Sequence, residues 1–163
     1  MSRLLCAVAG LLAITWPAAV LACWDQASVR YQINPDLLYA IAKCESGLRA
    51  NVINRSSTMR TGMYDIGLMQ INSSNLRRLD VYGIHEEQLY DACTSIQVGA
   101  WILAGAFKKY GFSWEGVGAY NTACTERKGK DCAAMRSKYA WCVYRNLPTR
   151  SAPANTIAHR EIK

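Results

Sequence analysis

The sequence is poor in the residues that build metal sites. It contains 2 histidines, His85 and His159, and none of its 7 cysteines stands in a Cys-x-x-Cys pair. Structural zinc sites use closely spaced cysteines and histidines as ligands. The sequence therefore predicts no metal site.

The chain also lacks internal repeats and a high content of charge. Charged residues make up 19% of the sequence and hydrophobic residues 51%, which is typical of a globular protein and not of a disordered one. A length of 163 residues suits one compact domain and is short for two. We therefore expect a single globular domain.

The first 22 residues have the composition of a secretory signal peptide. A short basic start is followed by an apolar run over residues 4–20, and the segment ends at the small residue Ala22. No stop-transfer pattern follows it. We expect residues 1–22 to be removed on export to the periplasm. A retained membrane anchor and lipid attachment at Cys23 remain as alternatives.

Loss of this leader would remove Cys6 and leave six cysteines. An even number of cysteines in an exported chain predicts disulfides, because the compartment is oxidising. Cys124 and Cys132 are close in sequence and can close a local loop around a polar stretch. The other four cysteines are Cys23, Cys44, Cys93 and Cys142.

No continuous basic stripe is present, although the net charge is +7. The basic residues form only short clusters, at 77–78, 108–109 and 127–130. A basic surface suits polyanions such as nucleic acid, anionic lipid or the acidic peptide stems of a cell wall, and it also serves solubility. Because the leader predicts export, we expect no nucleic-acid partner.

Helical periodicity dominates the chain. Asn34, Pro35 and Asp36 are a typical helix start, with a capping residue, a proline in the first turn and an acid. Leucine and isoleucine follow at helical spacing up to Leu48, and Gly47 ends this helix. Before and after it we expect a helix over 23–31, a loop with a small hairpin over 51–64, and a strand or turn over 65–72. A helix over 73–79 follows, capped by Ser73 or Ser74, and then a long helix capped by Asp91 or Thr94 and ended by Gly111. The last elements are a short helix or turn over 113–120, a helix capped by Asp131 that ends at Asn146, and a disordered tail over 148–163.

Glu45 is an acid on the apolar face of its predicted helix. It follows Ile41 by four residues and Leu38 by seven, so the three side chains share one face. Apolar surroundings disfavour the charged form of a carboxyl and raise its pKa. A carboxyl protonated near neutral pH can donate a proton to the leaving oxygen of a glycosidic bond. A glutamate whose end reaches water is the alternative.

Three short motifs then occur in order along the chain. They are Glu45-Ser46, the run Gly67-Leu68-Met69-Gln70-Ile71-Asn72, and Ala119-Tyr120-Asn121. Together they resemble the motifs of the soluble lytic transglycosylases, and most of all those of the small specialised members that accompany type III and type IV secretion, pilus and conjugation systems. The resemblance covers residues 23–147. It implies a mainly α, lysozyme-like α+β fold, with one helical domain, a small hairpin segment and a glycan-binding groove.

The resemblance also implies a role for each matching residue. Glu45 matches the catalytic acid and base, and Ser46 the hydroxyl residue beside it. Gln70 matches a residue that contacts the sugar, while Gly67 and Met69 shape the wall of the groove. The remaining matches are Tyr120 and Asn121 near the scissile bond and, more loosely, Tyr139 of the last helix. Met69 and Tyr120 have core packing as an alternative role. For Trp114 and Trp141 we expect core packing, with stacking on sugar rings as the alternative.

The specialised relatives share a disulfide that matches Cys23 with Cys93. Together with the local Cys124–Cys132 pair, this leaves Cys44 to pair with Cys142 by elimination. Such a bridge would join the helix of Glu45 to the last helix. Cys44, beside Glu45, and the segment 124–132 both depart from the general family pattern.

The resemblance implies cleavage with one carboxyl group, whereas ordinary glycosidases use two. Asp65 is the nearest other acid, and we assign it to the turn before Gly67. In the implied reaction the substrate's own N-acetyl group attacks the sugar, a 1,6-anhydro ring closes, and no cofactor is needed. Peptidoglycan strands are the expected partner of a monomer, with a secretion, pilus or conjugation machine as a further candidate. A hydrolytic lysozyme and an inactive glycan-binding subunit remain alternatives.

Overall fold

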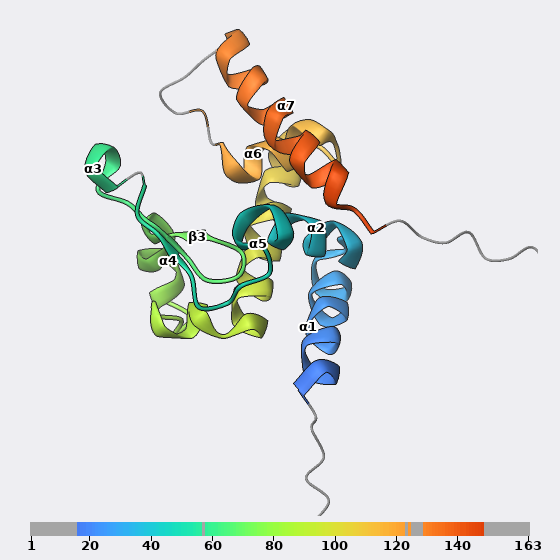
Figure 1. Ribbon diagram of the computed structural model, residues 1–163, viewed down its shortest axis with the longest axis vertical. Helices are drawn as coiled ribbons and strands as arrows, with labels where there is room; N and C mark the ends of the chain where they lie inside the picture. The colour runs from blue at the N-terminus through green and yellow to red at the C-terminus, as the bar shows by residue number, and fades with distance from the viewer. Residues whose placement is uncertain (1–15, 57, 123, 125–128, 149–163) are drawn as a thin grey trace, which may run out of the picture.

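The computed structural model describes residues 16–56, 58–122, 124 and 129–148. Most of the predicted leader and tail, residues 1–15 and 149–163, lie outside it. In chain order the elements are α1 (Trp16–Tyr31), α2 (Pro35–Ser46), β1 (Ile53–Asn54), α3 (Thr58–Thr61), β2 (Asp65–Ile66), β3 (Ile71–Asn72), η1 (Ser73–Asn75), α4 (Leu76–Asp80), η2 (Glu87–Tyr90), α5 (Ala92–Tyr110), α6 (Trp114–Asn121) and α7 (Gly129–Asn146). A small antiparallel sheet lies to one side of the helices, next to α4 and α5 (Figure 1).

Helix α5 is the centre of the core. Asp91 caps it by accepting the Thr94 amide at 2.8 Å, and Gly111 ends it, as predicted. Its apolar stripe packs against α1, α2 and α6, and four residues of that stripe are buried: Ile96, Ala100, Leu103 and Phe107. Burying such side chains is the main source of stability in a domain of this size.

Helix α2 begins and ends as its sequence predicts. The Asn34 side chain accepts the Asp36 amide at 2.8 Å, Pro35 occupies the first turn, and Gly47 closes the helix with φ of 63°. This left-handed conformation is accessible to glycine at little cost. The two caps therefore fix where α2 begins and ends, and Glu45 lies in its final turn.

The sheet has three short strands in the order β1-β2-β3, all antiparallel. Ile53 pairs with Ile66, and Ile66 pairs in turn with Ile71. A small hairpin is present as predicted, but its second strand, β2, lies just beyond the expected range of 51–64. Helix α3, which was not predicted, lies at the far end of the arm between β1 and β2 (Figure 1). The β2–β3 turn carries the Gly67 to Gln70 motif and directs it at the helices.

Helix α7 packs on α6 and α2. Arg136 is buried between α6 and α7, where its guanidinium donates to Glu115, to the Tyr110 hydroxyl at 3.0 Å and to the Thr122 carbonyl at 3.1 Å. A side chain at Gly118 would collide with Arg136, so the two helices can lie this close only because Gly118 has none.

Three disulfides join the cysteines in the pairs expected from the sequence. They are Cys23–Cys93, Cys44–Cys142 and Cys124–Cys132. The second links α2 to α7 beside Glu45. These two helices are thus fixed to each other by a covalent bond as well as by packing.

Three expected features of the helices are wrong. The first helix was expected over 23–31, but α1 starts at Trp16 and so runs across the predicted end of the leader at residue 22. Several of the apolar residues that precede Cys23, the alanines and Leu21, are also good helix formers. Leu48 follows the left-handed end of α2 and is exposed, since helical spacing no longer applies there. Asp131 lies inside the first turn of α7, which begins at Gly129.

The cap of η1, the short helix that leads into α4, also differs from the prediction. Asn72, and neither Ser73 nor Ser74, provides it by accepting the Ser74 amide at 3.1 Å. An asparagine side chain forms such a contact with the amide two residues later.

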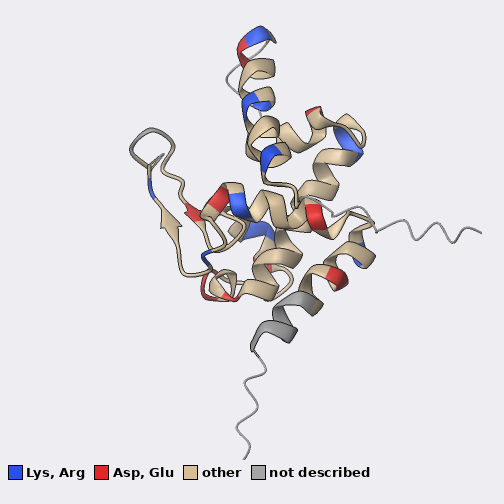
Figure 2. Cartoon of the chain, turned by 45° about the vertical axis from the view of Figure 1, so that its right-hand side comes forward, with Lys and Arg blue, Asp and Glu red and all other residues tan. Residues whose placement is uncertain are grey.

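In the view of Figure 2, the lysines and arginines of the described residues lie at several separate places. Among the helices of the described residues, none combines the length and the apolar character needed to cross a membrane.

Candidate active site

Glu45 and Tyr139 meet across the α2–α7 contact. The Tyr139 hydroxyl donates a hydrogen bond to Oε1 of Glu45 at 2.5 Å, although 94 residues separate the two in sequence. Glu45 is half-buried at the end of α2. This hydrogen bond restrains the orientation of the carboxyl.

Burial raises the pKa of Glu45 from 4.5 to about 7. Loss of solvent around the carboxylate is the largest cause, and the negative charge of Asp65 adds to it. Hydrogen bonds from Tyr139 and Asn121 act in the opposite direction and lower the pKa. A carboxyl with a pKa near 7 is protonated in a large fraction of molecules at neutral pH and can act as a general acid.

Asp65 faces the site from β2, and not from the turn to which the sequence assigned it. Its Oδ1 accepts a hydrogen bond from Nδ2 of Asn72 at 2.8 Å across the strand pair. Its charge raises the pKa of both Glu45 and Tyr120. The site thus contains a second carboxyl group that the sequence pattern had not marked.

Tyr120 connects α6 to the β2–β3 turn. Its hydroxyl donates to the Met69 carbonyl at 2.8 Å, and its ring stacks on Tyr139 with 6.4 Å between ring centroids. Burial raises the pKa values of both tyrosines well above the ordinary value. Both hydroxyls therefore stay protonated and serve as donors.

The β2–β3 turn is held by its own polar groups. Gln70 has φ of 49° and is largely buried, and its Nε2 donates to the Gly67 carbonyl at 2.9 Å. The buried amide thus has the partner it requires. At Gly67, with φ of 76°, a side chain would come within 2.0 Å of the Leu89 carbonyl. Only glycine fits there.

Ser46 and Met69 lie behind the site. Ser46 is 2% exposed, and its hydroxyl donates to the Leu68 carbonyl at 2.7 Å. The Met69 side chain is fully buried against Gly99. These two residues support the end of α2 and the turn from within.

Asn121 ends α6 with its side chain exposed and close enough to Glu45 to affect its pKa. The structure therefore gathers side chains from α2, β2, α6 and α7 around one carboxyl group. In the residues it describes, no group of three or more His, Cys, Asp or Glu could hold a metal ion.

Asp65 is an acid near the site that the sequence analysis named but assigned to a turn. The available signal was an acid two residues before the Gly67 motif, on a segment predicted to be a strand or turn. Alternation along a strand could have placed its side chain on one face, but not beside Glu45, which lies on another element.

The chain is similar to known proteins over most of its length. A sequence model described as the transglycosylase SLT domain matches residues 22–140. Invasion protein IagB of Salmonella typhi is 47% identical over 131 residues, covering 80% of this chain and 79% of that protein. An X polypeptide of Escherichia coli is 47% identical over 126 residues (76% and 70%), and protein IpgF of Shigella flexneri 40% over 124 residues (76% and 77%).

The fold is also found among solved structures. One is an inactive mutant of the lytic transglycosylase Slt from Pseudomonas aeruginosa, with a TM-score of 0.61 and 17% sequence identity. The match covers 83% of this chain and only 24% of that longer chain, so it shows the lysozyme-like fold alone. With the family model matching most of the sequence, the chain belongs to the transglycosylase SLT domain family and is a peptidoglycan lytic transglycosylase.

Proposed function

We propose that the protein cleaves the β-1,4 bond between N-acetylmuramic acid and N-acetylglucosamine without water and leaves 1,6-anhydro ends, with Glu45 as acid and base. The observation that carries this proposal is the half-buried Glu45, whose pKa is about 7 and whose orientation Tyr139 fixes. A carboxyl that exchanges a proton twice in one reaction needs a pKa near the working pH.

In the first step, protonated Glu45 gives its proton to the bridging oxygen. The bond from that oxygen to the sugar carbon breaks, and the carbonyl oxygen of the substrate's N-acetyl group bonds to the same carbon. This route needs no protein nucleophile. The negative charge of Asp65, which acts on Glu45, would also stabilise the positive charge that develops on the sugar.

In the second step, ionised Glu45 takes the proton of the sugar's 6-hydroxyl. The hydroxyl oxygen then bonds to the sugar carbon and displaces the N-acetyl oxygen, which closes the anhydro ring. Glu45 is protonated again and no water is consumed. Tyr139 would hold the carboxylate through both steps, while Tyr120, Asn121 and the Gly67–Gln70 turn would position the sugar.

A hydrolytic lysozyme is the second candidate, and Asp65 is the observation in its favour. Retaining glycosidases place two carboxyl groups about 5–5.5 Å apart and inverting ones about 6.5–9.5 Å apart. If Asp65 activated water or bonded to the sugar, the products would carry reducing ends. Mass analysis of digested peptidoglycan separates the two, since anhydro products are lighter by one water.

We also propose that residues 1–22 are removed on export, that residues 23–147 are the catalytic domain and that residues 148–163 form a tail. Three disulfides suit an oxidising compartment such as the periplasm, where the substrate lies. The groove for the glycan strand stays a prediction that accompanies this assignment.

The similarity to an invasion protein supports a more specific role. We propose that the enzyme opens the wall locally for a secretion, pilus or conjugation apparatus. Deletion of the gene should then reduce assembly of that apparatus, and catalytically inactive protein should fail to restore it.

The direct test of the assignment is Glu45→Gln with purified cell walls. Glutamine keeps the shape of the side chain and cannot give up a proton, so activity should fall about 100- to 10,000-fold. Asp65→Asn, measured beside it, should lower the rate while the products keep their anhydro ends. A folded Glu45→Gln variant with a tenth of wild-type activity would contradict the role of Glu45, and wild-type products with reducing ends would favour the lysozyme.

A further inference from the structure

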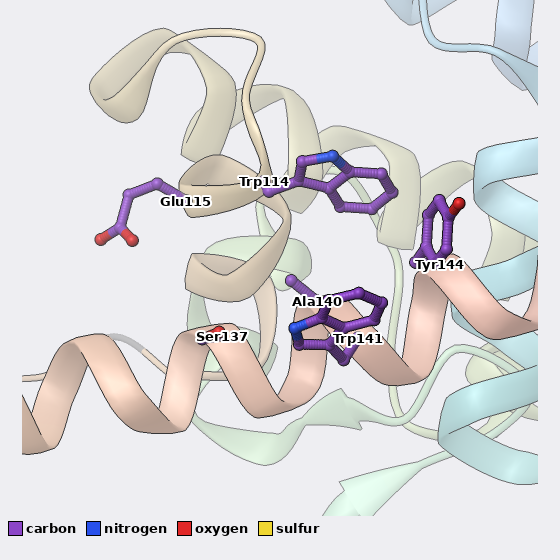
Figure 3. A pocket seen from close by; sticks show the side chains of 6 residues that line it. All are labelled: Trp114, Glu115, Ser137, Ala140, Trp141 and Tyr144. Carbon is purple, nitrogen blue, oxygen red and sulfur yellow. The ribbon is translucent and has the colours of Figure 1, made fainter.

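Three aromatic side chains form an exposed box between α6 and α7. Trp114 comes from α6, and Trp141 and Tyr144 come from α7 (Figure 3). They are 47%, 56% and 54% exposed, so the core packing expected for the two tryptophans is wrong. Large aromatic side chains on a surface, gathered at one place, indicate a binding site.

The rings are arranged as walls around a cavity. The Tyr144 ring is nearly perpendicular to both indoles, at 82° to Trp114 and 87° to Trp141, with centroid distances of 5.7 and 5.4 Å. The cavity has a volume of about 370 Å³, and Ala140 and Ser137 complete its wall along α7. This volume falls in the range of small-ligand sites.

The box lies on the opposite side of α7 from the catalytic carboxyl. Residues in a helix advance by about 100° each, so Trp141 and Tyr144 point about 200° and 140° away from Tyr139. Tyr139 contacts Glu45, whereas the side chains of the box face α6 and solvent. The box is therefore separate from the catalytic site.

We propose that this box is a second glycan-binding site that holds one amino-sugar ring of a peptidoglycan strand. The proposal rests on peptidoglycan being the substrate. A pyranose ring has apolar C–H faces that pack on indole and phenol rings, and its edge hydroxyls need polar partners such as the Ser137 hydroxyl at the cavity wall. The box offers both kinds of contact.

The local charge favours a sugar over a cation. Perpendicular aromatic rings also suit ammonium groups. The carboxylate of Glu115 at the rim is, however, paired with Arg136, and its side chain points away from the three rings (Figure 3). Helices α6 and α7 together carry two acidic and four basic residues: Glu115, Asp131, Lys130, Arg136, Lys138 and Arg145. This net positive charge repels a cation and suits strands whose peptide stems are acidic.

A second site would keep the enzyme on the wall between cuts. Two weak contacts with one polymer network act together, because the first contact raises the effective concentration at the second. The box should therefore add to the affinity for long strands.

The test is binding of the inactive Glu45→Gln protein to purified glycan strands from which the peptide stems have been removed. Adding Trp141→Ala should weaken binding about three- to tenfold, the range for loss of one aromatic contact. Trp141→Phe, which keeps an aromatic face, should restore most of the binding. Tyr82→Ala is the matched control, because Tyr82 is 70% exposed and lies after α4, away from α6 and α7. Unchanged thermal unfolding of each variant shows that the fold is intact.

Two outcomes would overturn the proposal. Unchanged binding of the Trp141→Ala protein to strands with and without stems would mean that the box takes no part in wall binding and instead faces a protein. Weaker binding only to strands that keep their stems would mean that the ligand is the peptide. Neither outcome affects the catalytic assignment, which is tested by the products and by the activity of the Glu45→Gln protein.

Discussion

Replacing Glu45 by Gln is expected to stabilise the protein in a way that depends on pH. The pKa of the Glu45 carboxyl is about 7 in the folded protein, against 4.5 for the unperturbed group. Between these values the unfolded chain releases a proton that the folded protein keeps. The free energy of unfolding therefore falls as the pH rises from 4.5 to 7.

The size of the effect follows from the shift. The difference between 4.5 and about 7 corresponds to about 3.4 kcal/mol, at about 1.36 kcal/mol for each unit. Above pH 7 the folded protein holds Glu45 in its ionised form, and the full loss of unfolding free energy is present. Below pH 4.5 the carboxyl is protonated in both states, and this loss disappears. Glutamine carries no charge, so the variant should gain about 2–3 kcal/mol over the wild type at pH 8 and almost nothing at pH 4.

Urea unfolding followed by circular dichroism, with the disulfides intact, measures this difference. Glu87→Gln is the matched control, since Glu87 is an exposed glutamate on η2. Its effect should be small at both pH values. An equal gain from Glu45→Gln at pH 4 and pH 8, or a loss at pH 8, would refute the account of Glu45 as a carboxyl destabilised by burial.

Three further predictions follow from contacts around the site. Tyr139→Phe removes a hydrogen bond that lowers the pKa of Glu45, so the fall of kcat/KM on the alkaline side should move about one unit to higher pH. Gly67→Ala forces a side chain onto the Leu89 carbonyl and should destabilise the fold by about 2–4 kcal/mol, measured by urea unfolding. Cys142→Ser, combined with the same change in its α2 partner, opens a loop of 98 residues and should cost about 2–5 kcal/mol of unfolding free energy.

Each of these predictions has a control in the same chain. Tyr144→Phe alters a tyrosine on the other side of α7 and should leave the pH profile in place. Gly105→Ala adds a methyl group where no atom lies within 4 Å and should not destabilise the fold. Removing the Cys124–Cys132 bridge opens a loop of only 8 residues and should cost less. The reasoning fails if any control matches its test variant in effect.

Local sequence determined the ends of the helices and the buried stripe of α5. Asn34 and Gly47 bound α2, and Asp91 and Gly111 bound α5, because caps and left-handed glycines act through atoms a few residues away. Asp131 was wrongly taken as a cap, because α7 already begins at Gly129 and Asp131 lies in its first turn. The presence of an element is thus easier to predict than its exact boundary.

The sequence also marked Glu45 by its place on an apolar face, and its motifs indicated the family. The resemblance already implied that Tyr139 belongs to the site. Only the tertiary structure shows its hydrogen bond to Glu45 and the effect of Asp65 on that carboxyl, since both depend on contacts between segments distant in sequence. It likewise placed Trp114 and Trp141 at the surface, although their apolar character favoured the core. The periodicity of a sequence predicts which residues share one face of a helix. The pKa of a group on that face depends on the side chains of other elements that pack against it, and these are known only from the tertiary structure.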